Sequence, residues 1–169
     1  MDYSFEKEFS AIQSNMVSVC IWFIKDLAEK IYIWLSHERR LYSFNCFFQI
    51  HGRIVTMGYV PNALQPGDPP FGKSEVANQD FVLRTLVEED MKLIKLFKAN
   101  NRELPTQIQL IYDVTTRSLE ANYRYDKVFS KDPQAWPDIA FRQWMKEEAD
   151  KLGTEVIDVY HVNDTKRRE

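Results

Sequence analysis

The sequence predicts an α+β fold, a single domain in which helices pack on one face of an antiparallel sheet of about five strands, in the order α-β-β-β-α-β-β-α. Two observations predict it. Residues 106–126 alternate apolar and polar side chains with a period of two, which is typical of half-buried antiparallel strands. Longer segments on either side repeat apolar residues every three or four positions, which is typical of amphipathic helices.

The alternating stretch is predicted to be a hairpin at the centre of the sheet. Its connector, residues 115–117, is short enough for a tight turn although it has neither glycine nor asparagine. A register slip of one residue would expose the apolar side, at about 1.5–3 kcal/mol for each large side chain. That side consists of Ile108, Leu110, Tyr112, Val114, Leu119, Ala121, Tyr123 and Tyr125.

The chain before the hairpin is predicted to form a helix, three strands and a second helix. The first helix covers residues 3–27, and the strands cover 30–35, 41–50 and 53–60. Residues 60–74 hold four prolines and two glycines and are predicted to be a loop, which is long for a compact domain. The second helix covers residues 75–99.

A linker and a third helix are predicted after the hairpin. The linker covers residues 127–133, and the helix covers 136–152 with Gly153 at its C-cap position. We interpret residues 1–153 as one α+β domain and residues 154–169 as a C-terminal extension. Apolar residues in the extension indicate a short edge strand, and its basic end indicates a charged tail.

Composition limits the classes of function. The chain has 169 residues and a net charge of −3, and its basic residues are scattered, so no nucleic-acid-binding face is indicated. Its first residues lack the basic region of a signal peptide, and the apolar run Met16–Ile24 is too short to span a bilayer. Cys20 and Cys46 are interpreted as buried free thiols. We therefore expect a cytoplasmic protein without membrane or direct nucleic-acid contacts.

The sequence contains few residues in the patterns that catalytic or metal sites use. His37, His51 and His161 lie in different predicted elements, and none has a metal-ligand spacing to a cysteine, histidine or acid. We interpret His37 and His51 as turn residues. There is no glycine-rich phosphate loop and no nucleophile elbow. We therefore expect no enzyme activity, catalytic residue, metal or cofactor. A catalytic histidine–acid pair assembled across the fold is the alternative that the sequence leaves open.

Aromatic residues on the first two strands have two interpretations. Tyr32, Trp34 and Phe47 lie on the side opposite the alternating core residues. Either a helix covers that side too or the residues make a second small core, or the three residues form a partner site.

The polar side of the hairpin also has two interpretations. It carries Asp113, Glu120 and Asp126, with Arg124 among them. Such a face either stays in water or presents acids to a basic partner.

Several stretches resemble the YezG-like immunity protein family, which are bacterial antitoxins encoded beside secreted polymorphic toxins. The resemblance covers roughly residues 5–150 and rests on the order and spacing of the pieces EKIYIW, KLIKLFKANNRELP, TQIQLIYDV, SLEANYRYD and QAWPDIAFRQWMKEE. The chain departs from the family at Arg117, where the family's turn often has a glycine. The proline-rich loop and the segment after Gly153 are also less typical.

The resemblance implies an immunity protein that binds and neutralises the C-terminal toxic domain of a cognate secreted or contact-dependent growth inhibition toxin, often a nuclease. We also expect a monomer or weak dimer. The alternative is a non-catalytic protein-interaction domain of unrelated role. The family supplies no fixed set of binding residues. Patterning alone suggests the Pro61–Lys73 loop as a second region and, as toxin-binding residues, Tyr32, Trp34, Asp113, Glu120 and Asp126.

Overall fold

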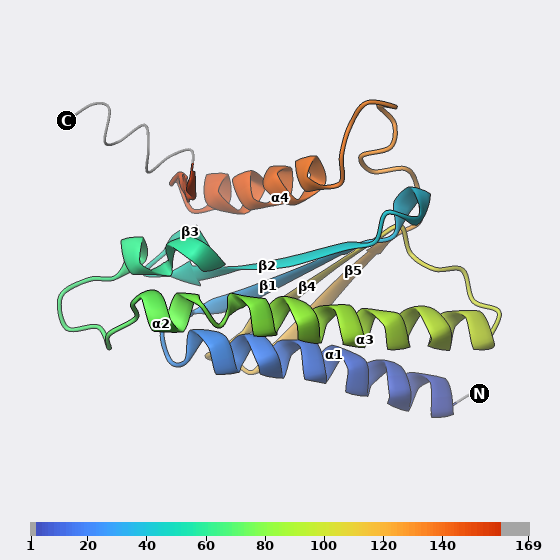
Figure 1. Cartoon of the computed structure of the whole chain (residues 1–169), viewed down its shortest axis with the longest axis horizontal. Helices are drawn as coiled ribbons and strands as arrows, with labels where there is room; N and C mark the ends of the chain where they lie inside the picture. Colours follow the sequence, from blue (N-terminus) through green and yellow to red (C-terminus); the bar gives the residue numbers. More distant parts are fainter. Residues whose placement is uncertain (1–2, 160–169) are drawn as a thin grey trace.

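The computed structural model describes residues 3–159, which form a six-stranded sheet with helices on both faces (Figure 1). The strand order is β5-β4-β1-β2-β3-β6, and every neighbouring pair is antiparallel except β3 and β6. The predicted α+β class is confirmed, but the sheet is mixed and has one strand more than expected. The strands are β1 (Lys30–Ser36), β2 (Ser43–Ile50), β3 (Arg53–Thr56), β4 (Gln107–Asp113), β5 (Ser118–Arg124) and β6 (Val156–Ile157).

The helices occupy the predicted segments with shifted ends. The first two predicted helices correspond to α1 (Tyr3–Ile24) and to the one-turn α2 (Lys73–Val76) followed by α3 (Gln79–Ala99). The third corresponds to α4 (Asp138–Lys151). The third predicted strand is shorter than expected, because Met57–Ala63 forms a 3₁₀ helix in place of its second half.

The first core lies between the sheet and the α1–α3 layer. Alternate residues of β1 point into it, as the sequence predicts, and each is fully buried. Cys20 of α1 and Cys46 of β2 are free thiols in this core. Hydrogen bonding to Cys20, together with burial, raises the pKa of the Cys46 thiol. The apolar stripe of α1 enters the core through Phe5, Ile12, Met16, Val19, Cys20 and Phe23.

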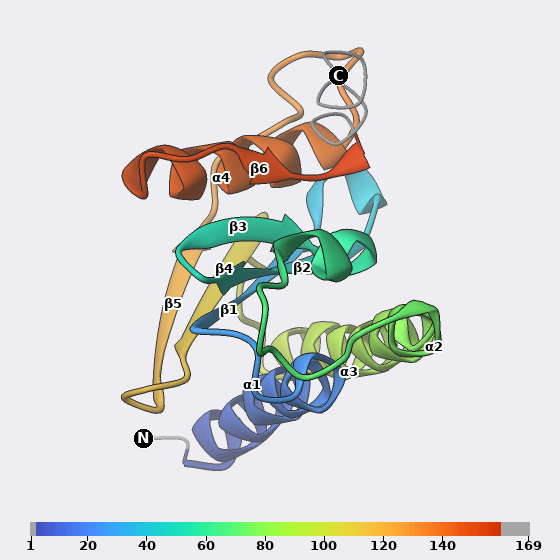
Figure 2. The same ribbon diagram turned by 90° about the vertical axis from the view of Figure 1, so that its left-hand side faces the viewer.

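The second core lies under α4, on the opposite face of the sheet (Figure 2). Tyr32 and Phe47 stack at 4.3 Å between ring centroids, and Trp144 meets Phe47 edge-on at 4.9 Å. Trp34 packs against Phe141 beside them. The expectation that helices lie on one face is therefore wrong, because the aromatic side of β1 and β2 needs its own cover.

The hairpin of β4 and β5 lies at the edge of the sheet, so its predicted central position is wrong. The centre is β1, whose residues from Ile31 to Ser36 are all buried. A central strand covered on both faces needs a nearly continuous apolar run, and IYIWL is such a run. In β5, every residue except Ala121 is exposed, and α4, which packs on β1, β2, β3 and β6, leaves its own face of β5 open.

The C-terminal extension begins with a short strand. Val156 and Ile157 pair with Ile54 and Val55 of β3 and both are buried. This agrees with the predicted edge strand, and the predicted basic tail lies outside the described residues. Within residues 3–159, no helix is both long and apolar enough to cross a membrane.

Replacing the central residue of the second core tests its contribution to stability. We expect Trp144→Ala to lower the free energy of unfolding by about 3–5 kcal/mol, because it removes a buried indole that contacts Tyr32 and Phe47. Chemical denaturation measures the change. The control is Trp22→Ala in α1, where the side chain is 51% exposed, and its cost should be about 1 kcal/mol or less. Equal costs for the two variants would contradict a second core.

Candidate protein-binding surface

Residues 37–40, directly after β1, organise one end of the sheet. The His37 amide donates to the Thr106 carbonyl at 2.9 Å, and the chain then turns sharply. Arg39 and Arg40 both have positive φ angles, 56° and 58°. Residues with a Cβ rarely adopt this conformation, so surrounding contacts must hold the turn in place.

His37 connects this end of the sheet to α3. Its Nε2 lies 2.8 Å from Oδ1 of Asp90, and its Nδ1 lies 2.9 Å from the Pro105 carbonyl oxygen. A carbonyl oxygen only accepts, so Nδ1 donates to it. The two side chains are 1% and 3% exposed. This is a histidine–acid pair assembled across the fold, and it joins β1 to α3 rather than facing solvent.

Glu38 connects the same end of the sheet to the segment that leads into α4. Its buried carboxylate accepts hydrogen bonds from the Val128 amide at 2.8 Å, the Phe129 amide at 3.1 Å and the Ser130 hydroxyl at 2.6 Å. Hydrogen bonds to an ionised acceptor are stronger than those between neutral groups. Glu38 therefore fixes the backbone of residues 128–130.

Arg39 holds the next part of the same segment. Its guanidinium donates to the carbonyl oxygens of Ser130, Asp132 and Pro133 at 3.1–3.3 Å and lies over the Phe129 ring. Three bonds from one planar group leave the segment few alternative conformations. Together, Glu38 and Arg39 hold residues 128–133 against the turn.

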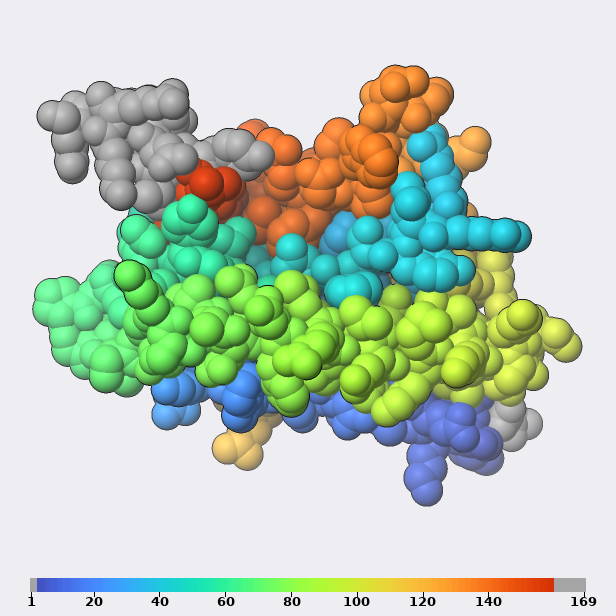
Figure 3. All heavy atoms as spheres, in the orientation of Figure 1, coloured from blue at the N-terminus to red at the C-terminus, as the bar shows by residue number. Residues whose placement is uncertain are grey.

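The fixed segment carries an aromatic residue to the surface. Trp136 is 67% exposed and stands beside Tyr42, which is 43% exposed. They border a hollow of about 470 Å³, which we call the Trp136 corner and which is lined by Arg40, Leu41, Tyr42, Ser43, Trp136 and Pro137. Figure 3 shows the two contributing segments, cyan and orange, meeting at the upper right. Tryptophan, tyrosine and arginine are the residues most enriched at binding hot spots.

A polar groove lies next to this corner, between α4 and the open face of β4 and β5. It is a hollow of about 310 Å³, and Arg124, Lys131 and Glu147 bring both signs of charge to it. Gln107 on its floor accepts a hydrogen bond from the Trp34 indole at 3.0 Å. Residues 128–137 connect the groove to the corner, so we treat the two as one candidate surface.

Two of the predicted binding residues cannot reach a partner. Tyr32 and Trp34 are each 2% exposed beneath α4, so their assignment to a surface site is wrong. The physical reason is that α4 buries the aromatic side of β1. Burial raises the pKa of the Tyr32 phenol, and the Glu148 carboxylate adds to the effect.

The three predicted acids lie on the hairpin but do not converge. Asp113 accepts from the Thr115 and Thr116 amides at 2.9 and 3.1 Å, so it shapes the turn. Asp126, at the other end of the hairpin, pairs with Arg124, which holds the pKa of Asp126 below its usual value. Glu120 is exposed in β5 and pairs in register with Ile111.

The predicted second region, Pro61–Lys73, lies at the opposite end of the molecule from the Trp136 corner (Figure 1). Phe71 anchors it in the first core against Phe23. Asp68 anchors it again by accepting from the Gln65 amide at 2.7 Å and contacting His51 at 2.8 Å. These contacts fix the loop, and the structure does not bring it together with the other predicted residues.

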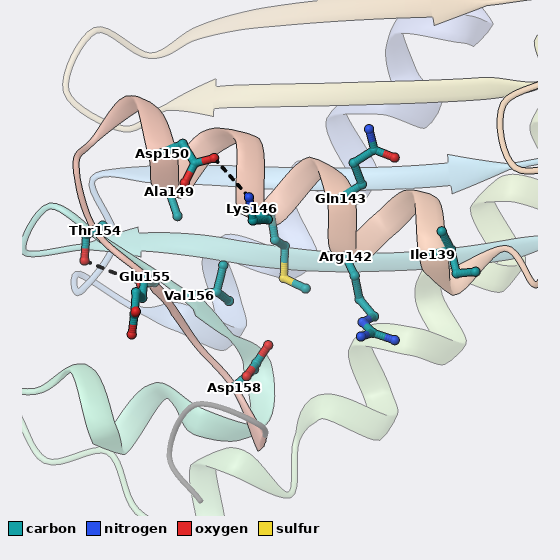
Figure 4. A pocket seen from close by; sticks show the side chains of 11 residues that line it. Ile139, Arg142, Gln143, Lys146, Ala149, Asp150, Thr154, Glu155, Val156 and Asp158 are labelled. Atoms are coloured by element: carbon teal, nitrogen blue, oxygen red, sulfur yellow. Dashed lines mark hydrogen bonds and ion pairs between the residues drawn. The ribbon is translucent and has the colours of Figure 1, made fainter. Parts of the chain in front are cut away.

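A further hollow, of about 690 Å³, lies between α4 and residues 154–158 (Figure 4). Its apolar lining includes Met145 and Val156, and Lys146 and Asp150 form an ion pair of 3.5 Å at its rim. It contains none of the residues suggested by the sequence. Among residues 3–159, no three histidine, cysteine or acidic side chains lie close enough to hold a metal ion.

Comparison with protein-family models and with curated proteins finds no match to the chain. The residues that build the candidate surface, Glu38, Tyr42 and Trp136, were not suggested by the sequence. One signal was present in the run HERR, which places four polar residues directly after the most apolar strand.

Removing the charge of Glu38 tests how the surface is held. We expect Glu38→Gln to lower the free energy of unfolding by about 1–3 kcal/mol, because one carboxylate oxygen becomes an amide NH2 group that faces a hydrogen-bond donor. Hydrogen exchange of the Val128 and Phe129 amides should become faster. The control Ser130→Ala removes only the hydroxyl bond and should cost about 1 kcal/mol. Unchanged amide protection in Glu38→Gln would show that other contacts hold the segment.

The anchoring of the proline-rich loop should depend on pH. The Gln65 amide and His51 lower the pKa of Asp68. The stabilisation from these bonds is therefore complete above the unfolded-state pKa of about 3.9 and is lost as the pH falls through the lower folded-state pKa. The chemical shift of the Gln65 amide should titrate with a midpoint below that value and stay flat in Asp68→Asn. A midpoint at or above it would contradict the bonds.

Proposed function

We propose that the protein is an immunity protein that binds and neutralises the C-terminal toxic domain, a nuclease, of a cognate bacterial secreted or contact-dependent toxin. The observation that carries the proposal is the Trp136 corner, where exposed tryptophan, tyrosine and arginine side chains lie beside a segment, residues 128–130, that is fixed by the buried Glu38. The resemblance to YezG-like immunity proteins supplies the class of partner.

In this proposal Trp136 is the anchor of the complex. An exposed indole that enters an apolar pocket of a partner gains a large buried area, and a rigid backbone reduces the entropy lost on binding. Arg39 and Glu38 supply that rigidity, because they hold the preceding residues through six hydrogen bonds. Arg40 and Tyr42 lie beside the anchor, and in the complex they help to exclude water from it.

The polar groove supplies electrostatic selectivity beside the anchor. Glu147 lines the groove together with Arg124 and Lys131, and Glu120 is exposed on the same side of the hairpin. The Arg124 charge is already paired with Asp126. A nuclease domain presents basic residues to nucleic acid, and acids placed against them compete with the phosphate backbone. Neutralisation is then steric and electrostatic occlusion, and it requires no reaction by this chain.

The test is co-expression with the toxic domain encoded next to this chain. We expect the wild-type protein to restore growth and to co-purify with the domain. Trp136→Ala should raise the dissociation constant at least about 30-fold, the size expected for a hot-spot residue. The matched control is Trp22→Ala, an exposed tryptophan in the α1–α3 layer, which should bind as the wild type does. Calorimetry measures both constants.

Two outcomes would contradict the proposal. Growth arrest despite abundant folded wild-type protein would exclude neutralisation, and co-purification with an unrelated protein would favour the alternative of an interaction domain with another role. If Trp22→Ala weakened toxin binding and Trp136→Ala did not, the function would stand but the corner would not be the binding site.

A further inference from the structure

The outer edge of β5 has no partner strand among the described residues. The strand is seven residues long, pairs with β4 without a bulge and contains no proline. Leu119 is 40% and Tyr123 is 38% exposed on the side facing α1. An unpaired edge of this length presents a row of backbone donors and acceptors, which is a template for pairing with another strand.

The sequence of β5 is complementary to itself when two copies run antiparallel with Asn122 opposite Asn122. Side chains directly opposite each other in such a pair lie on the same face of the sheet. In this register, Glu120 of each copy lies opposite Arg124 of the other, so two opposite-charge pairs form. No like charges lie directly opposite each other within the strand.

The apolar side of the strand matches in the same register. Ala121 lies opposite Tyr123, so a small residue faces a large one in both halves of the pair. Leu119 lies opposite Tyr125, which is 50% exposed in the single chain. Pairing would cover both of these residues, and three of the four have half-exposed apolar surface in the single chain.

Arg124 can serve both its present partner and a second copy. Its Nε and one terminal nitrogen bind the Asp126 carboxylate at 3.0 and 2.6 Å. A guanidinium has five N–H donors, so other donors remain for Glu120 of the second copy.

We propose that the protein forms a two-fold symmetric dimer through antiparallel pairing of β5 with β5 of a second copy, with Asn122 on the axis. The two sheets become one continuous sheet of twelve strands, twice the six of one chain. The interface is isologous, so it closes at two copies. The dimer does not depend on the proposed function, because its formation requires no toxin.

Charge reversal tests the register. Sedimentation of the wild-type chain across a dilution series should show a species of twice 20.1 kDa that dissociates on dilution. Glu120→Arg and Arg124→Glu each place like charges opposite each other twice, so each should raise the dimer dissociation constant by about tenfold or more. The double variant restores the pairs in reverse and should return close to the wild-type constant. Glu88→Arg, on the exposed side of α3, is the charge-matched control.

Cysteine cross-linking tests the axis independently of the strength of the dimer. Two residues directly opposite in an antiparallel pair have Cα atoms about 4.5–5.5 Å apart, which suits a disulfide. Asn122→Cys should therefore cross-link to a second copy with oxidised glutathione, whereas Glu120→Cys should not. The native cysteines, Cys20 and Cys46, are both buried and give no background.

The charge-reversal and cross-linking experiments together decide whether the dimer forms through β5. Rescue by the double charge reversal, together with cross-linking only at position 122, supports the dimer. A wild-type chain that stays at the mass of one copy at every concentration overturns it. A dimer that is indifferent to both charge reversals and cross-links equally at both positions also overturns it, because another surface would then hold it together.

Discussion

Two consecutive residues directly after β1 tie both helical layers to the same end of the sheet. His37, where the chain leaves the strand, reaches Asp90 of α3, and Glu38, the first residue of the turn, reaches the segment before α4. Both groups are buried and both are satisfied by partners, which avoids the cost of an unpaired buried charge. The arrangement of the corner, the groove and α4 depends on this pair of contacts.

The elements of the fold could be predicted because each shows its own period in the sequence. The stripe of α1 and the alternation of β4 and β5 identified the type of structure, and only the ends shifted. The layer arrangement was harder, since the aromatic residues Tyr32 and Trp34 fit either a covered face or a partner site. A strand with apolar residues on both sides, such as β1, favours the covered face.

The candidate surface could not be predicted in the same way, because its contacts join distant parts of the chain. His37 and Asp90 are 53 positions apart, and Glu38 and Val128 are 90 apart. Contacts between residues this far apart leave no periodic pattern in the sequence. Trp136 shows the limit of periodicity most clearly. A helix starting at residue 136 would place it in line with Trp144, but α4 starts at Asp138 and the indole is left outside.

The left-handed backbone of Arg40 is unfavourable, and no contact of the Arg40 side chain within residues 3–159 compensates for it. Its left-handed backbone costs about 1–2 kcal/mol for a residue with a Cβ, and a glycine would remove that cost. Arg39 has the same left-handed conformation, but its side chain donates three hydrogen bonds that offset the free-energy cost. The Arg40 side chain makes neither a hydrogen bond nor an ion pair within residues 3–159. The Arg40 guanidinium therefore borders the Trp136 corner with its donors available to a partner of the kind we propose.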